Sequence, residues 1–221
     1  MTAKSPSLAA FTLFAAFALS VPATAARYAQ GERIQVTGIV SDAQGRPLEG
    51  VRVVFEASRN TFDVRVLRRT SKDLRKVAAT TDAQGTYTID WIWDNYFNHF
   101  ELAAGIMVRR AQVGETLEEL DRTNITRQVE AGSPVVAAVV IHNRRAIDRF
   151  REFLASVKSA DEQRIYQEMG KPDRVERVQY PGSVEASWWY FEAGRAYRFR
   201  DGRLEQVVPF DPVRGFGSEV Q

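Results

Sequence analysis

The stretch from Ile34 to Phe55, IQVTGIVSDAQGRPLEGVRVVF, decides the fold class. Its apolar residues recur at nearly every second position on both sides of a central DAQG turn. Such alternation, bounded by Asp and Gly, predicts two β-strands joined by a tight connection. We expect the Asp42 carboxylate to accept backbone N–H groups further along the turn, and Gly45 to supply a positive φ.

The same turn recurs in the stretch TDAQGTYTI, residues 81–89, where Tyr87 and Ile89 resume the alternation. Later, Val135 to Ile141 forms a nearly continuous β-branched run, which favours a central buried strand. Counting the shorter alternating segments between them, about seven strands fall within about 110 residues. The sequence therefore predicts a mainly β protein whose N-terminal part is a seven-stranded β-sandwich.

These motifs resemble carboxypeptidase regulatory-like domains. The resemblance is carried by Val36–Val40, Asp42, Gly45, Pro47-Leu48, Gly50-Val51, Val53 and Thr81–Ile89. It implies a transthyretin-like sandwich that serves as an accessory module and has no catalytic residues of its own. The chain departs from the family pattern between Ser58 and Val77, where a long Arg-rich hairpin is inserted.

A different pattern begins at Ala146. Apolar residues at spacings of three and four predict a helix, and Ser159 is a suitable N-cap for a second helix that ends at Gly170. Alternating segments at 174–180, 185–192, 195–200 and 203–208 then predict a β-meander joined by tight turns such as Asp201-Gly202. The C-terminal part is thus predicted to be a small α+β domain of two helices and a meander.

This second domain resembles the SmpA/OmlA-type domains of outer-membrane assembly lipoproteins. The resemblance is carried by Met169–Pro172, Trp189-Tyr190 and Tyr197–Leu204. It implies a protein partner in outer-membrane assembly. The chain has no cysteine, so the lipid anchor of that family is not carried over.

The N-terminus predicts export. Lys4 precedes an apolar run from Leu8 to Val21, and small residues follow, as in a secretory signal peptide cleaved after Ala25 or Ala26. The alternative is an N-terminal membrane anchor. Predicted divisions are a signal peptide at 1–26, the sandwich at 27–145, the α+β domain at 146–210 and a flexible tail at 211–221. We expect a periplasmic or secreted protein of the Gram-negative envelope, with no transmembrane segment in its mature chain.

Composition and motifs narrow the function classes. Lys and Arg number 30 against 28 Asp and Glu, a balance that does not favour nucleic-acid binding. The two histidines, His99 and His142, lack metal-ligand spacing, and no nucleophile elbow, phosphate loop or dinucleotide fingerprint occurs. We therefore predict no catalytic residue, metal or cofactor, although a hydrolase with two distant carboxylates stays open.

Three groups of residues are candidate binding surfaces. The aromatic segment with Trp91, Trp93, Asn95, Tyr96 and Phe97 suits a sugar or a protein partner, and the alternative is that its rings close the sandwich core.

The basic residues Arg65, Arg68 and Arg69 suit anionic lipid, and the alternative is a charged, protected edge hairpin. Alternation places Trp188 and Tyr190 on one face of the meander, where they could dock on the first domain or on another protein.

The leading prediction is a non-enzymatic envelope protein that binds or scaffolds another envelope protein, with a link to outer-membrane assembly or integrity. The first alternative is a carbohydrate- or lipid-binding accessory module that uses the aromatic segment at 91–100. The second alternative is an inhibitor of an envelope enzyme, which rests on fold analogy.

Overall fold

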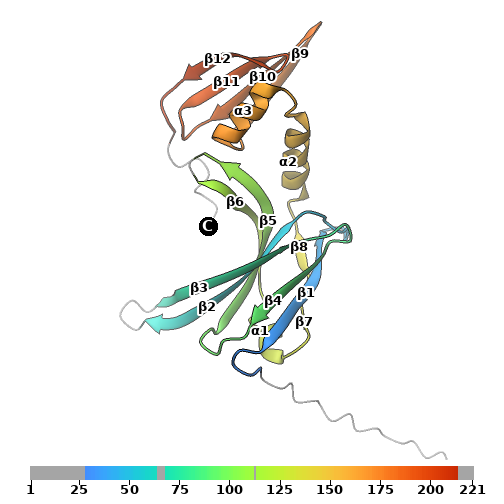
Figure 1. Cartoon of the computed structure of the whole chain (residues 1–221), viewed down its shortest axis with the longest axis vertical. Helices are drawn as coiled ribbons and strands as arrows, with labels where there is room; N and C mark the ends of the chain where they lie inside the picture. The colour runs from blue at the N-terminus through green and yellow to red at the C-terminus, as the bar shows by residue number, and fades with distance from the viewer. Residues whose placement is uncertain (1–27, 64–67, 112, 214–221) are drawn as a thin grey trace, which may run out of the picture.

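The computed structural model describes residues 28–63, 68–111 and 113–213, with the backbone alone for 62–63 and 68–72. The chain is mainly β, with several sheets and three helices in these ranges, so the predicted fold class is confirmed. Figure 1 shows two lobes joined by a narrow waist. The N-terminal lobe contains strands β1–β8, and the C-terminal lobe contains helix α3 and strands β9–β12.

The N-terminal lobe consists of two facing sheets. In the first, β1 (Arg33–Asp42) pairs antiparallel with β4 (Thr86–Ile92) and parallel with β7 (Val135–Val136) and β8 (Val139–Ile141). The second has the order β3-β2-β5-β6, formed by Arg68–Thr80, Arg52–Asp63, His99–Arg110 and Gly114–Asn124. The described residues thus form eight strands here, one more than the sequence predicts.

The prediction of a central buried strand at Val135–Ile141 is wrong in two respects. The run lies at the edge of its sheet, and its residues are alternately buried and exposed. It is also interrupted at Ala137, which donates its N–H to Thr37 O at 2.9 Å and accepts the Tyr87 hydroxyl at 2.7 Å. Gly38 makes this close crossing possible, because a Cβ at that position would lie 1.7 Å from Ala137 O.

The two DAQG turns have the same geometry, as predicted. Asp42 Oδ1 accepts the N–H groups of Gln44 at 3.0 Å and Arg46 at 2.9 Å. Asp82 Oδ1 accepts the corresponding groups of Gln84 and Thr86, at 3.0 and 2.8 Å. The glycines that close the turns have φ values of 76° and 72°.

The C-terminal lobe is a four-stranded antiparallel meander with helices on one face. Its order is β12-β11-β10-β9, formed by Arg203–Pro209, Arg195–Arg200, Ser183–Tyr190 and Arg174–Tyr180. Helix α3 (Ala160–Met169) begins at Ser159, whose hydroxyl accepts Glu162 N at 3.1 Å in a complete capping box. The predicted meander therefore has its expected strands within a few residues of the expected bounds.

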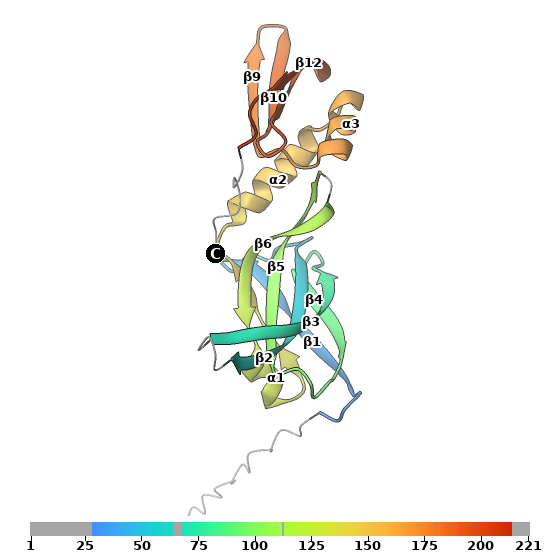
Figure 2. The same cartoon turned by 90° about the vertical axis from the view of Figure 1, so that its left-hand side faces the viewer.

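Helix α2 (Arg144–Ser156) connects the lobes (Figure 2). Its first half buries Ile147 and Phe150 in the core of the sandwich. Further along, Phe153 packs against both cores, and its ring centroid lies 5.2 Å from that of Trp188 in the C-terminal lobe. One helix thus supplies apolar side chains to two hydrophobic cores.

The hairpin of β5 and β6 forms a second connection, because its tip reaches the C-terminal lobe (Figure 1). Lys171 donates its backbone N–H to Arg109 O at 2.7 Å. Gly170 fits tightly here, since a Cβ on it would lie 2.1 Å from Arg109 O. The Tyr190 hydroxyl donates to Gly170 O at 2.9 Å from the other side.

The ends of the chain are described in part. The predicted signal peptide at 1–26 and residues 214–221 of the predicted tail lie outside the described residues. Within that tail, Val213 donates its N–H to Phe191 O at 3.0 Å. No helix in the described ranges has the length and apolar character needed to cross a membrane.

Candidate ligand-binding cleft

Two rings of the aromatic segment belong to the sandwich core. Trp91 is 2% exposed, and its ring centroid lies 5.1 Å from that of Phe55 and 5.8 Å from that of Phe97. Arg75 covers both rings, with its guanidinium carbon 5.6 Å from the Trp91 ring and 5.4 Å from the Phe97 ring. Because β4 alternates, Trp91 points inward with Ile89 and cannot present its side chain to a ligand.

The remaining members of the segment reach the surface. Trp93 is half-buried, and its Nε1–H donates to Asn95 Oδ1 at 2.7 Å, which fixes the plane of the indole. Tyr96 is 44% exposed, and its hydroxyl donates to Asp73 on β3. This bond raises the pKa of Tyr96 above its ordinary value.

Trp93 forms part of an aromatic cavity of about 280 Å³ beside helix α1 (Thr126–Ala131). Its ring centroid lies 5.0 Å from that of Tyr28 and 5.5 Å from that of Phe100, and Phe97 also lines the cavity. Helix α1 closes the cavity with Val129, which is fully buried. We call this cavity the aromatic half, because a polar cleft adjoins it.

The Tyr28 hydroxyl is a buried polar group without a hydrogen-bond partner among the described residues. Burial raises the pKa of Tyr28, and the nearby Glu32 carboxylate adds to this effect. A buried hydroxyl that makes no hydrogen bond is destabilising, and the indole N–H groups of Trp91, Trp188 and Trp189 are in the same state among the described residues.

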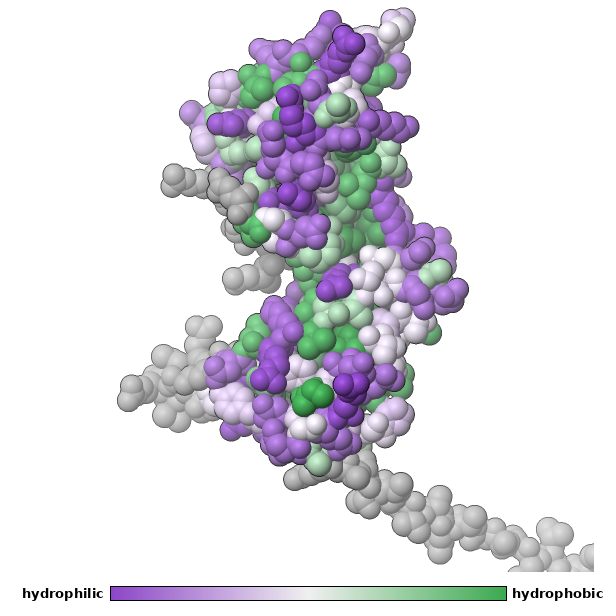
Figure 3. All heavy atoms as spheres, viewed as in Figure 1, coloured by the Kyte–Doolittle hydropathy of each residue, from purple (hydrophilic) through white to green (hydrophobic). Residues whose placement is uncertain are grey.

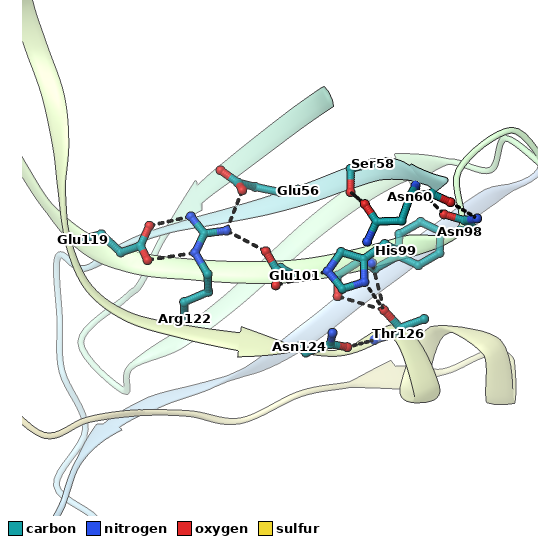
Figure 4. Close-up of polar contacts among 11 residues, drawn as sticks. Glu56, Ser58, Asn60, Asn98, His99, Glu101, Glu119, Arg122, Asn124 and Thr126 are labelled. Atoms are coloured by element: carbon teal, nitrogen blue, oxygen red, sulfur yellow. Dashed lines mark hydrogen bonds and ion pairs between the residues drawn. The ribbon is translucent and has the colours of Figure 1, made fainter. Parts of the chain in front are cut away.

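A polar cleft of about 570 Å³ adjoins the aromatic half, and both are lined by Asn98 and Glu130. We call it the polar half, and the two together the α1 cleft. Figure 4 shows how side chains from β2, β5, β6 and α1 converge there. The residues that line the polar half are Asn60, Thr61, Asn98, His99, Asn124, Thr126, Arg127 and Glu130.

Internal hydrogen bonds hold the walls of the polar half. Asn98 Oδ1 accepts Asn60 N at 2.8 Å, and Asn98 Nδ2 donates to Asn60 O at 3.0 Å, so the two segments are clamped together (Figure 4). Thr126 Oγ1 accepts Phe100 N at 3.0 Å, which fastens the start of α1 to β5.

Other polar groups of the α1 cleft are uncommitted. Within the described part of the chain, the guanidinium of Arg127 and the carboxylate of Glu130 form no ion pair or hydrogen bond. The oxygens of Asn95 and Asn124 are used internally, by Trp93 Nε1–H and by Thr126 N–H, whereas their NH₂ groups have no described partner. The cleft therefore offers several donors and an acceptor to a ligand.

An ion-pair cluster on the outer sheet face supports the polar half (Figure 4). Arg122 on β6 binds Glu56 at 2.7 Å and Glu101 at 2.8 Å, and it also binds Glu119 at 2.5 Å. The hydrogen bond with Glu119 is the largest of the effects that raise the pKa of Arg122. The cluster links β2, β5 and β6, which are adjacent in their sheet, and so stabilises the part of the sheet next to the polar half.

Glu56 is a buried charge in this cluster. Burial alone would raise its pKa, but hydrogen bonds from Arg122 and from Lys76, at 2.5 Å, lower it below the ordinary value. His99 adjoins the same cluster, with Nε2 3.2 Å from Glu101 Oε1 and Nδ1 3.5 Å from Thr126 Oγ1.

The other candidate surfaces have different positions. Trp188 is fully buried and Tyr190 is 5% exposed, because both point to the helix-covered face of the meander. The interpretation of these two as a docking surface is wrong: they form the core of the C-terminal lobe itself. Trp189, on the opposite face, is half-buried and packs 5.8 Å from Phe210.

Of the basic candidates, Arg65 lies outside the described residues, and Arg68 and Arg69 are described only as backbone in β3. Their neighbours Arg75 and Lys76 are engaged within the lobe, over the Trp91 ring and with Glu56.

A further hollow of about 600 Å³ lies at the waist, where Figure 3 shows apolar side chains between the lobes. Phe150, Phe153 and Val175 line it, together with charged groups of both signs. One of these, Lys171, is bound to Glu118. Among the described residues that line this hollow, none has a buried side-chain polar atom without a hydrogen-bond partner.

Of the residues that line the α1 cleft, the sequence predicted Trp93, Asn95 and Phe97 as binding candidates and missed the others. Tyr28, Asn98, Asn124, Arg127 and Glu130 come from three separate segments of the chain, around residues 28, 98 and 124–130. No local motif links them, because the pairing of β5 with β6 and the short helix α1 bring them together.

Comparisons with known proteins add little to this description. No protein-family model matches the chain, and no curated protein sequence matches it. The solved structure of a 9R-lipoxygenase from Cyanothece PCC8801 matches over 86% of this chain and 44% of that chain, with 8% sequence identity and a TM-score of 0.29. The chain spans less than half of that lipoxygenase, and a TM-score this low supports no argument about fold or activity.

Proposed function

We propose that the protein is an exported, non-enzymatic binding protein of the cell envelope and that its ligand occupies the α1 cleft. The observation that carries this proposal is that an aromatic cavity and a polar cleft with uncommitted groups adjoin each other at Asn98 and Glu130. Ligand sites are typically concave, largely apolar, and fitted with a few directed polar groups. Export to the periplasm or beyond is supported by the signal-like N-terminus.

The arrangement of charges favours binding over catalysis. Glu56, beside the cleft, is bound to Arg122, which lowers the pKa of this carboxyl, and a carboxyl with a lowered pKa is a poor general acid. Among the described residues that line the cleft, Glu130 is the only carboxylate, and hydrolysis by a carboxylate pair requires two.

The test is a ¹H–¹⁵N NMR titration of the chain that starts at residue 27. The probes are soluble envelope saccharides, vesicles containing phosphatidylglycerol, and a peptide pool, each added separately. We expect one class to shift the Trp93 indole signal and the signals of α1, with these shifts lost in an Arg127→Ala/Glu130→Ala variant. No shift at the cleft with any probe would refute the proposal.

A second candidate, protein binding or scaffolding in outer-membrane assembly, is favoured by strand β9. This strand lies at the edge of its sheet. Val175, Val178 and Tyr180 on it are 40%, 48% and 45% exposed. An exposed edge with apolar side chains can pair with a strand from another protein. Cross-linking of envelopes with a Val178→Lys variant tests it, since the added charge would abolish capture of a specific partner while leaving the cleft signals unchanged.

A further inference from the structure

We infer that the ligand of the α1 cleft is a neutral saccharide chain with at least two pyranose rings. This inference rests on the proposed ligand-binding function and names the chemistry of the ligand. It starts from the division of the cleft into an apolar and a polar half that share Asn98 and Glu130.

The aromatic half suits the apolar face of a sugar ring. A pyranose has one face of C–H groups, and such a face packs well on aromatic rings, whereas its hydroxyls point outward along the edge. Trp93 is rigid enough for this role, because Asn95 fixes its indole N–H and Phe100 stacks against it at 5.5 Å. Tyr28 also lines this cavity, and its ring centroid lies 5.0 Å from that of Trp93, so it adds a second aromatic wall.

The polar half suits hydroxyl groups, which both donate and accept hydrogen bonds. The NH₂ group of Asn124 and the guanidinium of Arg127 are donors, and the Glu130 carboxylate is an acceptor. Since Asn98 and Glu130 lie at the junction, a ring in the aromatic half is adjacent to the polar half and the chain continues there.

The cleft has room for more than one ring. The aromatic half measures about 280 Å³, near the lower end of ligand sites, which typically span about 300–1,000 Å³. The polar half adds about 570 Å³. A single ring would leave the larger half filled with water and its polar groups without ligand contacts.

The charge of the cleft favours a neutral chain over a lipid headgroup. Among the described residues that line it, the groups without an ion-pair partner are one cation, Arg127, and one anion, Glu130. An anionic headgroup would meet the carboxylate of Glu130 as well as the guanidinium of Arg127.

The experiment is calorimetric and NMR titration of the chain that starts at residue 27 with neutral mono-, di- and tetrasaccharides of the malto-, cello- and chito-series. We expect the disaccharide or tetrasaccharide of one series to bind at least tenfold more tightly than its monosaccharide. We expect Trp93→Ala to abolish binding, and Trp93→Phe, which retains a ring, to weaken it by a smaller factor.

The matched control is Tyr96→Ala, which removes an exposed ring of the same loop that does not line the cleft, and we expect it to bind as wild type. Arg127→Ala, which lies in the polar half alone, should reduce the gain from the second ring more than it reduces monosaccharide binding. Glu130→Gln, at the junction, should weaken binding of the monosaccharide and of the longer chain. Circular dichroism and the unfolding midpoint verify that each variant is folded.

Three outcomes would overturn the inference. Equal affinity for one ring and for four would contradict the two-ring site, and saccharide-induced shifts outside the cleft would contradict its location. Cleft shifts caused by phosphatidylglycerol vesicles or peptides, with none from any saccharide, would refute the sugar while leaving the binding function intact. If no probe shifts the cleft, the binding function itself fails.

Discussion

The ammonium group of Lys171 lies 2.6 and 2.7 Å from the two carboxylate oxygens of Glu118, and this ion pair joins the two lobes. Lys171 follows helix α3, whereas Glu118 belongs to β6 of the sandwich. Arg110 also lies 3.5 Å from Glu118, so the carboxylate receives two cations. Both partners of the main pair are about one-quarter exposed, which limits but does not remove screening by water.

We expect the Lys171–Glu118 pair to couple the stabilities of the lobes. In a double-mutant cycle with Lys171→Met and Glu118→Gln, the coupling free energy from urea denaturation should be about 1 kcal/mol at low salt. It should decrease in 1 M NaCl because salt screens partly exposed charges. A coupling of zero at low salt would show that the pair contributes nothing to the junction.

Gly170→Ala should weaken the same junction by a steric route. The new Cβ would lie 2.1 Å from Arg109 O, and overpacking of this kind costs about 1–3 kcal/mol. Gly182→Ala is the matched control, because Gly182 also has a positive φ, 86° against 73°, but nothing lies within 4 Å of its Cβ. The free energy of unfolding should fall further in the first variant than in the second, and equal losses would contradict the clash.

Trp188→Ala should destabilise the C-terminal lobe by about 3–5 kcal/mol, since it removes a fully buried indole. Trp189→Ala is the control, and its effect should be smaller because that side chain is half-buried on the opposite face. Thermal unfolding of both variants measures the difference. If Trp188→Ala instead left stability unchanged and abolished capture of a partner, the side chain would be a surface contact after all.

The cluster around Arg122 should make stability depend on pH through Glu56. Its pKa is lowered in the folded chain, so its stabilising effect is complete above its ordinary pKa of 4.5 and is lost as pH falls through the lower folded value. Wild type should therefore be more stable than Glu56→Gln at pH 7, and this advantage should shrink below pH 4.5.

Urea midpoints of both proteins between pH 7 and pH 3 provide the measurement. Glu130→Gln serves as control at pH 7, where loss of a carboxylate with no described ion-pair partner should change stability by about 0.5 kcal/mol or less. A constant difference between wild type and Glu56→Gln across the pH range would refute the prediction.

Local chemistry made parts of this fold predictable. The Asp42 and Asp82 turns and the Ser159 capping box depend on residues within four positions of one another, so their signals are complete in a short window. The meander was predictable for the same reason, because its strands are joined by tight turns.

Other parts depend on contacts between distant segments. Alternation shows that Trp188 and Tyr190 share a face but cannot show which face the helices cover. Strand β6 is mostly polar and acquires its conformation by pairing with β5. Helix α1 has only six residues, too few for a readable period, and it is held in place by Val129 in the core.

Helix α2 makes the two lobes depend on each other in evolution, because its apolar side chains belong to both cores. A gene fragment that ends before Arg144 would encode a sandwich lacking Ile147 and Phe150. A fragment that begins after Ser156 would encode a meander lacking Phe153. Recombination at this junction would expose apolar surface in both products, so the two halves are expected to be inherited as one unit and not shuffled separately among other proteins.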